Sequence, residues 1–121
     1  MKYKSDNLPL AGNIVSDLVV LPHVDNMSSI SSSLDHYQIL DGIRELSMDF
    51  FSYTPPYSVS EYKKTEKLAK DILDSKTISP LIVVEDQKGF YILEGGHRFD
   101  ALNMLKIMSF PAVVVKDLKI D

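Results

Sequence analysis

A glutamate, two glycines, a histidine and an arginine follow one another at residues 94–98, between an apolar run and an apolar helical pattern. The first turn of a helix carries backbone N–H groups without intrahelical acceptors and a partial positive charge. Glycines before that turn let the backbone approach a ligand closely. The junction therefore predicts an anion site, with phosphate as its natural occupant.

Each side chain in this loop suggests a role toward phosphate. Arg98 suits bidentate contact with phosphate, and His97 can donate a hydrogen bond or transfer a proton. Glu94 could hold a metal ion, orient a nucleophile or fix Arg98. Taken alone, Gly95 and Gly96 are equally consistent with a simple strand-to-helix turn.

The loop needs a strand before it and a helix after it, and the surrounding pattern predicts both. Strands are expected over residues 80–86 and 90–94, joined by a turn at residues 87–89. A helix is expected over residues 98–106, with Phe99, Leu102 and Leu105 facing inward. A further strand is expected over residues 110–117. A longer helix is expected from Ser58, with its inward positions at Val59, Tyr62, Thr65/Glu66, Leu68/Ala69, Ile72 and Leu73. Residues 39–48 predict a strand with a turn or bulge at Asp41–Gly42, followed by a proline loop over residues 52–58. From Arg44 onward the order is β–α–β–β–α–β, which predicts a small mixed sheet with flanking helices, an α/β (α+β) fold.

The N-terminal third is expected to add little to this core. Residues 14–22 predict a strand that Pro22 ends. The serine-rich stretch over residues 26–36 is expected to be a mobile connection, because serines favour loops. We therefore predict one domain over residues 1–121, with a core over 43–115 preceded by an N-terminal strand and a serine-rich loop over 1–40.

Composition narrows the class of protein. The chain has 121 residues, a formal net charge of −4 and no cysteine, which excludes disulfides, thiolate metal sites and thiol nucleophiles. The net negative charge argues against binding nucleic acid through the overall charge of the protein. Binding through a local basic patch is still compatible with the sequence. No apolar run approaches a membrane span, and no signal peptide is recognisable, so a cytoplasmic location is expected.

The segments TEKLAKDILDSKTISPLIVVED and GFYILEGGHRFDALNMLKIMSFPAVVV resemble the ParB/sulfiredoxin superfamily over about residues 44–115. At the position of Glu94–Arg98, partition proteins carry glycine–acid–arginine–arginine and sulfiredoxins carry glycine–cysteine–histidine–arginine. Free-serine kinases of the superfamily carry aspartate–glycine–histidine–histidine–arginine. In all three branches this loop binds nucleotide phosphates, so the resemblance implies a bound nucleotide here.

The resemblance assigns roles residue by residue. Gly96 replaces the sulfiredoxin cysteine, which rules out the usual sulfinic-acid reduction. His97 and Arg98 match a phosphate-contacting pair, and Glu94 stands where the kinases have an aspartate. Lys64 resembles a basic residue that faces the nucleotide, although Lys63 or Lys67 could serve instead. Arg44 and Glu45 lie where the family often has an arginine or an acid, but they alternate in direction.

Other residues give weaker signals. The pairs His23–Asp25 and Asp35–His36 lack the spacing typical of metal sites, so ordinary surface residues are favoured. A base could stack on one of three tyrosines near the prolines, but an aromatic cluster sealing the core is equally consistent with them; these are Tyr53, Tyr57 and Tyr62.

Three functions compete. The first is an enzyme that uses ATP or another nucleoside triphosphate with Mg²⁺ held through Glu94, and that transfers or hydrolyses phosphate as a kinase, ATPase or nuclease. Its catalytic residues would be Glu94, His97 and Glu45, and its phosphate ligands Gly95, Gly96, His97, Arg98, Lys64 and Arg44. The second is a nucleotide-gated partition or regulatory module that reaches DNA through a basic patch or a separate DNA-binding protein. The third, a degenerate member serving as an interaction surface, is disfavoured by the intact loop.

Overall fold

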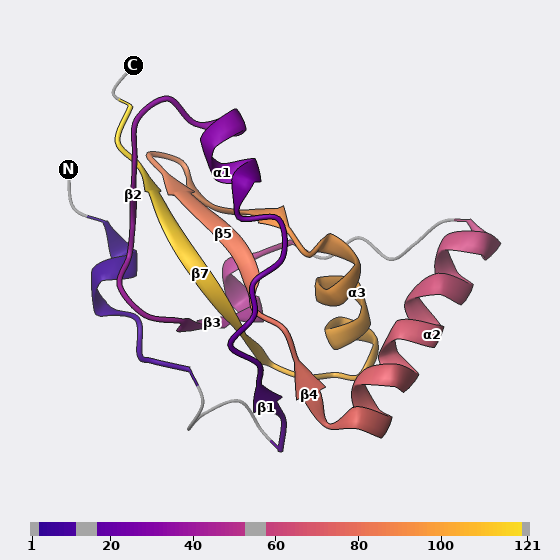
Figure 1. Cartoon of the computed structure of the whole chain (residues 1–121). Coiled ribbons are helices and arrows are strands. Elements are labelled where there is room, and N and C mark those ends of the chain that lie inside the picture. Colours follow the sequence, from indigo (N-terminus) through magenta and orange to yellow (C-terminus); the bar gives the residue numbers. More distant parts are fainter. Residues whose placement is uncertain (1–2, 12–16, 53–57, 120–121) are drawn as a thin grey trace.

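The computed structural model describes residues 3–11, 17–52 and 58–119 (Figure 1). The helices are η1 (Lys4–Asn7), α1 (Ser28–Ser33), η2 (Met48–Phe50), α2 (Val59–Ser75) and α3 (Gly96–Met104), where η marks a 3₁₀ turn. The strands are β1 (Val19–Val20), β2 (Tyr37–Ile39), β3 (Arg44–Ser47), β4 (Thr77–Ile78), β5 (Leu81–Asp86), β6 (Gly89–Glu94) and β7 (Ser109–Asp117). The predicted mixed α/β fold is confirmed.

Strands β5 and β7 form the centre of a five-stranded mixed sheet. They run parallel to each other, whereas β6 pairs antiparallel with β5, and β2 and β3 pair antiparallel with β7. Both central strands are almost entirely buried, which explains why they read as continuous apolar runs. The β1–β4 pair forms a separate two-stranded parallel sheet.

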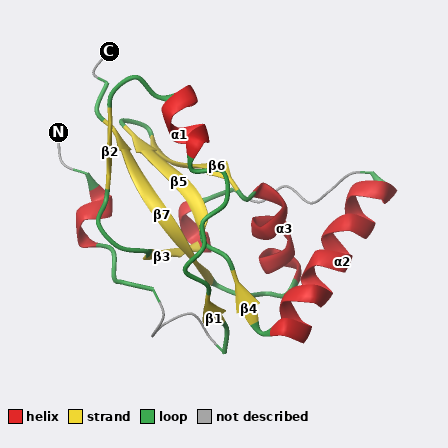
Figure 2. Ribbon diagram, in the orientation of Figure 1, coloured by secondary structure: helices red, strands yellow, loops and turns green. Residues whose placement is uncertain are grey.

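Helices cover the two faces of the sheet unequally (Figures 1 and 2). The larger hydrophobic cluster joins the sheet to α2 and α3, through residues that include Leu81, Val83, Ile72, Phe99 and Leu102. A smaller cluster joins the opposite face to α1, through residues that include Ile30, Leu34, Ile82 and Val84. Alternate residues of β5 therefore enter different clusters, as the two-residue period of a strand requires.

The serine-rich segment corrects one expectation. Residues 26–36 were expected to be a mobile connection, but residues Ser28–Ser33 form α1. Ile30 is only 1% exposed and Leu34 only 9%, so two apolar side chains fix the segment against the sheet. Burial of these side chains outweighs the preference of serine for loops.

Helix α2 begins where the sequence predicted, because the Ser58 hydroxyl caps it by accepting a hydrogen bond from the Glu61 N–H at 3.1 Å. The inward face is narrower than expected, since only Thr65, Ala69 and Ile72 are buried along the helix. Three positions expected to face inward are instead exposed, by 73%, 48% and 54%: Val59, Tyr62 and Leu73.

The remaining strand predictions hold in part. Residues 39–48 are interrupted at the expected Asp41–Gly42 turn, where Gly42 has a φ of 79°, and both β2 and β3 pair with β7. Of the strand expected over residues 14–22, the structure shows β1 (Val19–Val20); residues 12–16 lie outside the described part, as do residues 53–57 of the proline loop. The helix after the glycines is confirmed, with Phe99 and Leu102 buried and Leu105 packed at the edge of the larger cluster.

Candidate functional site: the junction of β6 and α3

The glycine pair forms the predicted strand-to-helix junction. Strand β6 ends at Glu94, Gly95 takes the N-cap position with a φ of 103°, and α3 begins at Gly96. The first helical hydrogen bond runs from the Phe99 N–H to the Gly95 carbonyl at 2.9 Å. The N–H groups of Gly96, His97 and Arg98 therefore have no acceptor within α3 and are free to receive an anion.

The structure requires a glycine at residue 95 but not at residue 96. Gly95 has a left-handed backbone, and a Cβ on it would lie 2.6 Å from Leu81 Cγ. Gly96 has no such restriction, because a Cβ there would meet no atom of the described chain within 4 Å. Gly95 is thus required for packing the loop onto β5, whereas Gly96 borders open space.

Arg98 anchors the helix to the sheet. Its Nη1 donates to the carbonyl oxygens of Ser79 and Pro80, at 3.0 and 3.1 Å, in the connection between β4 and β5. Hydrogen bonds from a charged donor contribute about 1.5–3 kcal/mol. The side chain therefore orients the start of α3 and still lines the pocket in front of it.

Glu94 is aimed by an irregularity in the β5–β6 pairing. The register shifts between Ile82 and Val83, so that Glu94 opposes Ile82 although Ile92 opposes Val83. This bulge places Glu94 on the α1 face, where Asn26 Nδ2 donates to Glu94 Oε1 at 3.0 Å. The Glu94 carboxylate is therefore held by an amide, and Arg98 makes its described hydrogen bonds with backbone carbonyls.

A pocket of about 310 Å³ opens in front of the junction, and we call it the phosphate pocket after the ligand that the sequence predicts for it. It is lined by residues 94–98 together with Asp25, Asn26, Leu68 and Ser79. Asn26 was missed as a site residue because only its position beside Glu94 in the fold gives it a role. Asp25 was considered as a metal ligand with His23, and the structure pairs these two exposed side chains at 2.7 Å.

Glu61 connects Lys64 to the junction, because its carboxylate contacts both Lys64 and His97. The Glu61 carboxylate is 3.8 Å from Lys64 Nζ and 3.9 Å from His97 Nδ1, so it lies between two side chains that the sequence predicted to contact phosphate. Burial raises the pKa of Asp100 in the same region; His97 opposes this shift and Glu61 adds to it. Of these side chains, His97 lines the pocket in front of the junction, whereas Lys64 is not among the described residues that line it.

Arg44 and Glu45 lie elsewhere. Both belong to β3, which pairs with β7 on the far side of β5 from β6. Arg44 donates to the carbonyls of Asp41 and Leu8, at 3.0 and 2.8 Å. Glu45 is 5% exposed and accepts a hydrogen bond from the Ser109 hydroxyl. Neither is among the described residues that line the phosphate pocket.

A metal at this junction would depend on the ligand for part of its coordination. Within residues 3–11, 17–52 and 58–119, no three His, Cys, Asp or Glu side chains gather as a metal site. The carboxylates of Asp25 and Glu94 do line one pocket. Mg²⁺ commonly binds one or two carboxylates together with substrate phosphates, so this donor set fits Mg²⁺ accompanied by a nucleotide.

The comparison with protein families identifies the chain. The model of the ParB N-terminal domain matches residues 31–120, which is most of the sequence. The chain belongs to the ParB N-terminal domain family. The match includes the whole β6–α3 junction and begins inside α1, so the family resemblance seen from the loop residues is confirmed.

Among solved structures, the chain is similar to a Pnob8-like ParB-N domain, with 16% identity and a TM-score of 0.47. The alignment covers 69% of this chain and 32% of that one, so the chain spans about a third of the length of the solved chain. No curated protein matches the chain. No helix among the described residues has the length and apolar character needed to cross a membrane.

The different roles of the two glycines can be tested by alanine substitution. We expect Gly95→Ala to lower the free energy of unfolding by about 1–3 kcal/mol, because a strained backbone and a close contact with Leu81 would combine. Gly96→Ala, the matched control, should leave stability unchanged or raise it by up to about 1 kcal/mol, because alanine favours helix. Urea unfolding measures both, and equal effects of the two substitutions would contradict this assignment.

Glu45 predicts a pH dependence of stability. Burial raises its pKa above the usual 4.5, and the Ser109 hydroxyl partly offsets the shift. The folded state therefore retains the Glu45 proton at pH values where the unfolded state has released it, and this group's contribution to stability falls as the pH rises above about 4.5. We expect Glu45→Gln to be more stable than the wild type at pH 7 and to lose that advantage below pH 4. A stability difference that does not change between these pH values would contradict the prediction.

Proposed function

We propose that this ParB N-terminal domain binds a nucleoside triphosphate with its phosphates at the start of α3. The observation that carries the proposal is the free first turn of α3, Gly96–Arg98, opening into a pocket that also holds the Arg98 and His97 side chains. Backbone N–H groups, a helix dipole and a guanidinium together favour a polyanion. Lys64 provides a further positive charge near His97, because Glu61 contacts both side chains.

We further propose that Glu94 supports transfer or hydrolysis of a phosphoryl group. A carboxylate beside phosphate is repulsive unless a cation or a substrate proton intervenes. Mg²⁺, when bound with the nucleotide, would neutralise charge between the carboxylates and the phosphates. The hydrogen bond from Asn26 leaves the second carboxylate oxygen of Glu94 available to accept a proton from an attacking water or hydroxyl.

Membership of the ParB N-terminal domain family favours a second candidate, in which the nucleotide gates a DNA-associated partition or regulatory role without catalysis. This candidate requires the same phosphate pocket but no reaction at Glu94. Glu45 is no longer a favoured catalytic group for the enzyme, since it is buried in β3, which lies on the far side of β5 from β6.

His97 is the cleanest probe of phosphate binding, because its side chain is 68% exposed and Arg98 also supports the fold. We expect His97→Ala to weaken the affinity for ATP or CTP with Mg²⁺ about 3–10-fold, the loss of one hydrogen bond worth about 0.5–1.5 kcal/mol. The control His36→Ala removes another exposed histidine, beyond α1, and should change nothing. Calorimetric titration measures both. Affinities that fall equally in the two variants, or in neither, would exclude His97 from the phosphate site.

Glu94→Gln separates the enzyme from the gated module. Glutamine keeps an acceptor for Asn26 but cannot accept a proton, so we expect nucleotide affinity to stay within a few-fold while phosphate release falls at least about 100-fold. Glu66→Gln, on the exposed side of α2, is the control and should retain full activity. Undiminished phosphate release in Glu94→Gln, or none in the wild type under conditions where nucleotide binds, would favour the module.

A further inference from the structure

A second pocket, of about 540 Å³, lies on the other side of the α3 start. Its walls are largely aromatic, and we call it the aromatic pocket: Phe50, Phe51, Phe90, Tyr91 and Phe99 line it together with residues that include Gly96 and Asp100. Gly96 lines both this pocket and the phosphate pocket. A Cβ at Gly96 would meet no atom of the described chain within 4 Å, so this shared wall carries no side chain that would separate a ligand in one pocket from the other.

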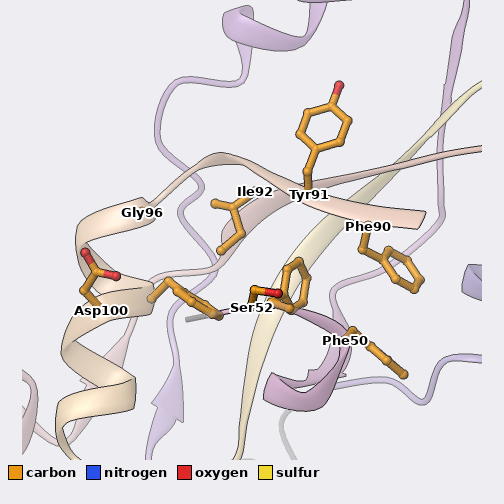
Figure 3. A pocket seen from close by; sticks show the side chains of 9 residues that line it. Phe50, Ser52, Phe90, Tyr91, Ile92, Gly96 and Asp100 are labelled. Carbon is orange, nitrogen blue, oxygen red and sulfur yellow. The ribbon is translucent and has the colours of Figure 1, made fainter. Parts of the chain in front are cut away.

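The aromatic walls are held in place by one another. Phe50 stacks on Phe90 with ring centroids 5.2 Å apart, and Phe51 contacts Phe90 and Phe99 at 6.2 and 5.5 Å. Phe50 is nevertheless 44% exposed, so part of this surface faces solvent. Figure 3 shows Phe50 and Phe90 at one end of the pocket, and Gly96 and Asp100 of α3 at the other. Tyr91 also lines the pocket, although Figure 3 shows its ring pointing away from Phe90 and Ile92.

We propose that the aromatic pocket binds the base of the nucleotide whose phosphates lie in the phosphate pocket, and that Asp100 favours bases that carry an amino group. This inference rests on the function proposed above and extends it to the part of the ligand that distinguishes one nucleotide from another. A triphosphate at the free N–H groups of α3 borders Gly96, so one ligand can reach both pockets.

The chemistry of the walls fits a base better than another anionic group. Every nucleobase has a flat π-face that can stack on aromatic side chains. The Asp100 carboxylate, by contrast, would repel a further phosphate group. The Asp100 carboxylate accepts N–H groups, and adenine, cytosine and guanine offer exocyclic amines that uracil lacks. The volume also lies within the range of small-molecule sites.

The test compares nucleotides with inorganic tripolyphosphate, which has no base. Calorimetry with Mg²⁺ gives the ratio of the dissociation constant of tripolyphosphate to that of ATP, and this ratio isolates the contribution of the base. We expect the ratio to exceed about 10 in the wild type and to fall about tenfold in Phe50→Ala, in line with the loss of base stacking. The affinity for tripolyphosphate itself should stay unchanged, because Phe50 does not line the phosphate pocket among the described residues.

Three further variants sharpen the comparison. Phe50→Tyr keeps the ring and should keep the ratio. Tyr62→Ala removes an exposed ring from α2 that lines neither pocket among the described residues, and it should also keep the ratio. Asp100→Asn changes the charge near the phosphates and so could alter the affinity for every nucleotide. Its effect is therefore measured as the ratio of the dissociation constant of UTP to that of ATP within the same variant. We expect that ratio to fall at least threefold.

The outcomes are distinct. A ratio near 1 in the wild type, or an equal fall in Phe50→Ala and Tyr62→Ala, would overturn the base site while leaving phosphate binding intact. Failure of tripolyphosphate and nucleotides alike to bind the folded protein would overturn the proposed function and this inference with it. A preference for UTP over ATP would overturn the role given to Asp100.

Discussion

The candidate site depends on one close contact, between the backbone of Gly95 and the side chain of Leu81. Leu81 is fully buried at the start of β5, and only a residue without a Cβ can turn against it with a φ of 103°. That turn ends β6 and begins α3 within one residue. Arg98 secures the same junction by bonding two carbonyls just before β5. The first turn of α3 therefore projects from a rigid sheet rather than from a loop.

The contacts that fix this junction suit the polyanion site proposed for it. Glu94, Arg98 and the first turn of α3 all line one pocket, and hydrogen bonds from Asn26 to Glu94 and from Arg98 to the carbonyls of residues 79 and 80 hold them in place. Such preorganisation lowers the cost of ordering a site when a ligand binds. Membership of the ParB N-terminal domain family is consistent with this arrangement, because the matched residues include every part of the junction.

The sequence was sufficient for features that depend on local pattern. The buried strands, the Ser58 cap and the glycine-to-helix junction each have a signature within a few residues. It was insufficient where tertiary contacts decide. Helix α1 exists because Ile30 and Leu34 reach the sheet, and Glu94 faces Asn26 because the hairpin register shifts by one residue. Val59 and Tyr62 follow a helical period but extend beyond the surface that the sheet and α3 cover, so periodicity alone misplaced them.

Amide chemical shifts report most directly on whether the start of α3 binds phosphate. In a ¹⁵N-labelled sample titrated with tripolyphosphate and Mg²⁺, the N–H signals of Gly96, His97 and Arg98 should move together and saturate, since these groups would donate to the anion. The exposed lysines Lys67 and Lys70 on α2 provide the comparison for nonspecific charge attraction. Saturable shifts centred on residues 96–98 would agree with the account. Shifts confined to the lysine face of α2, or no shifts at residues 96–98 at saturating ligand, would contradict it.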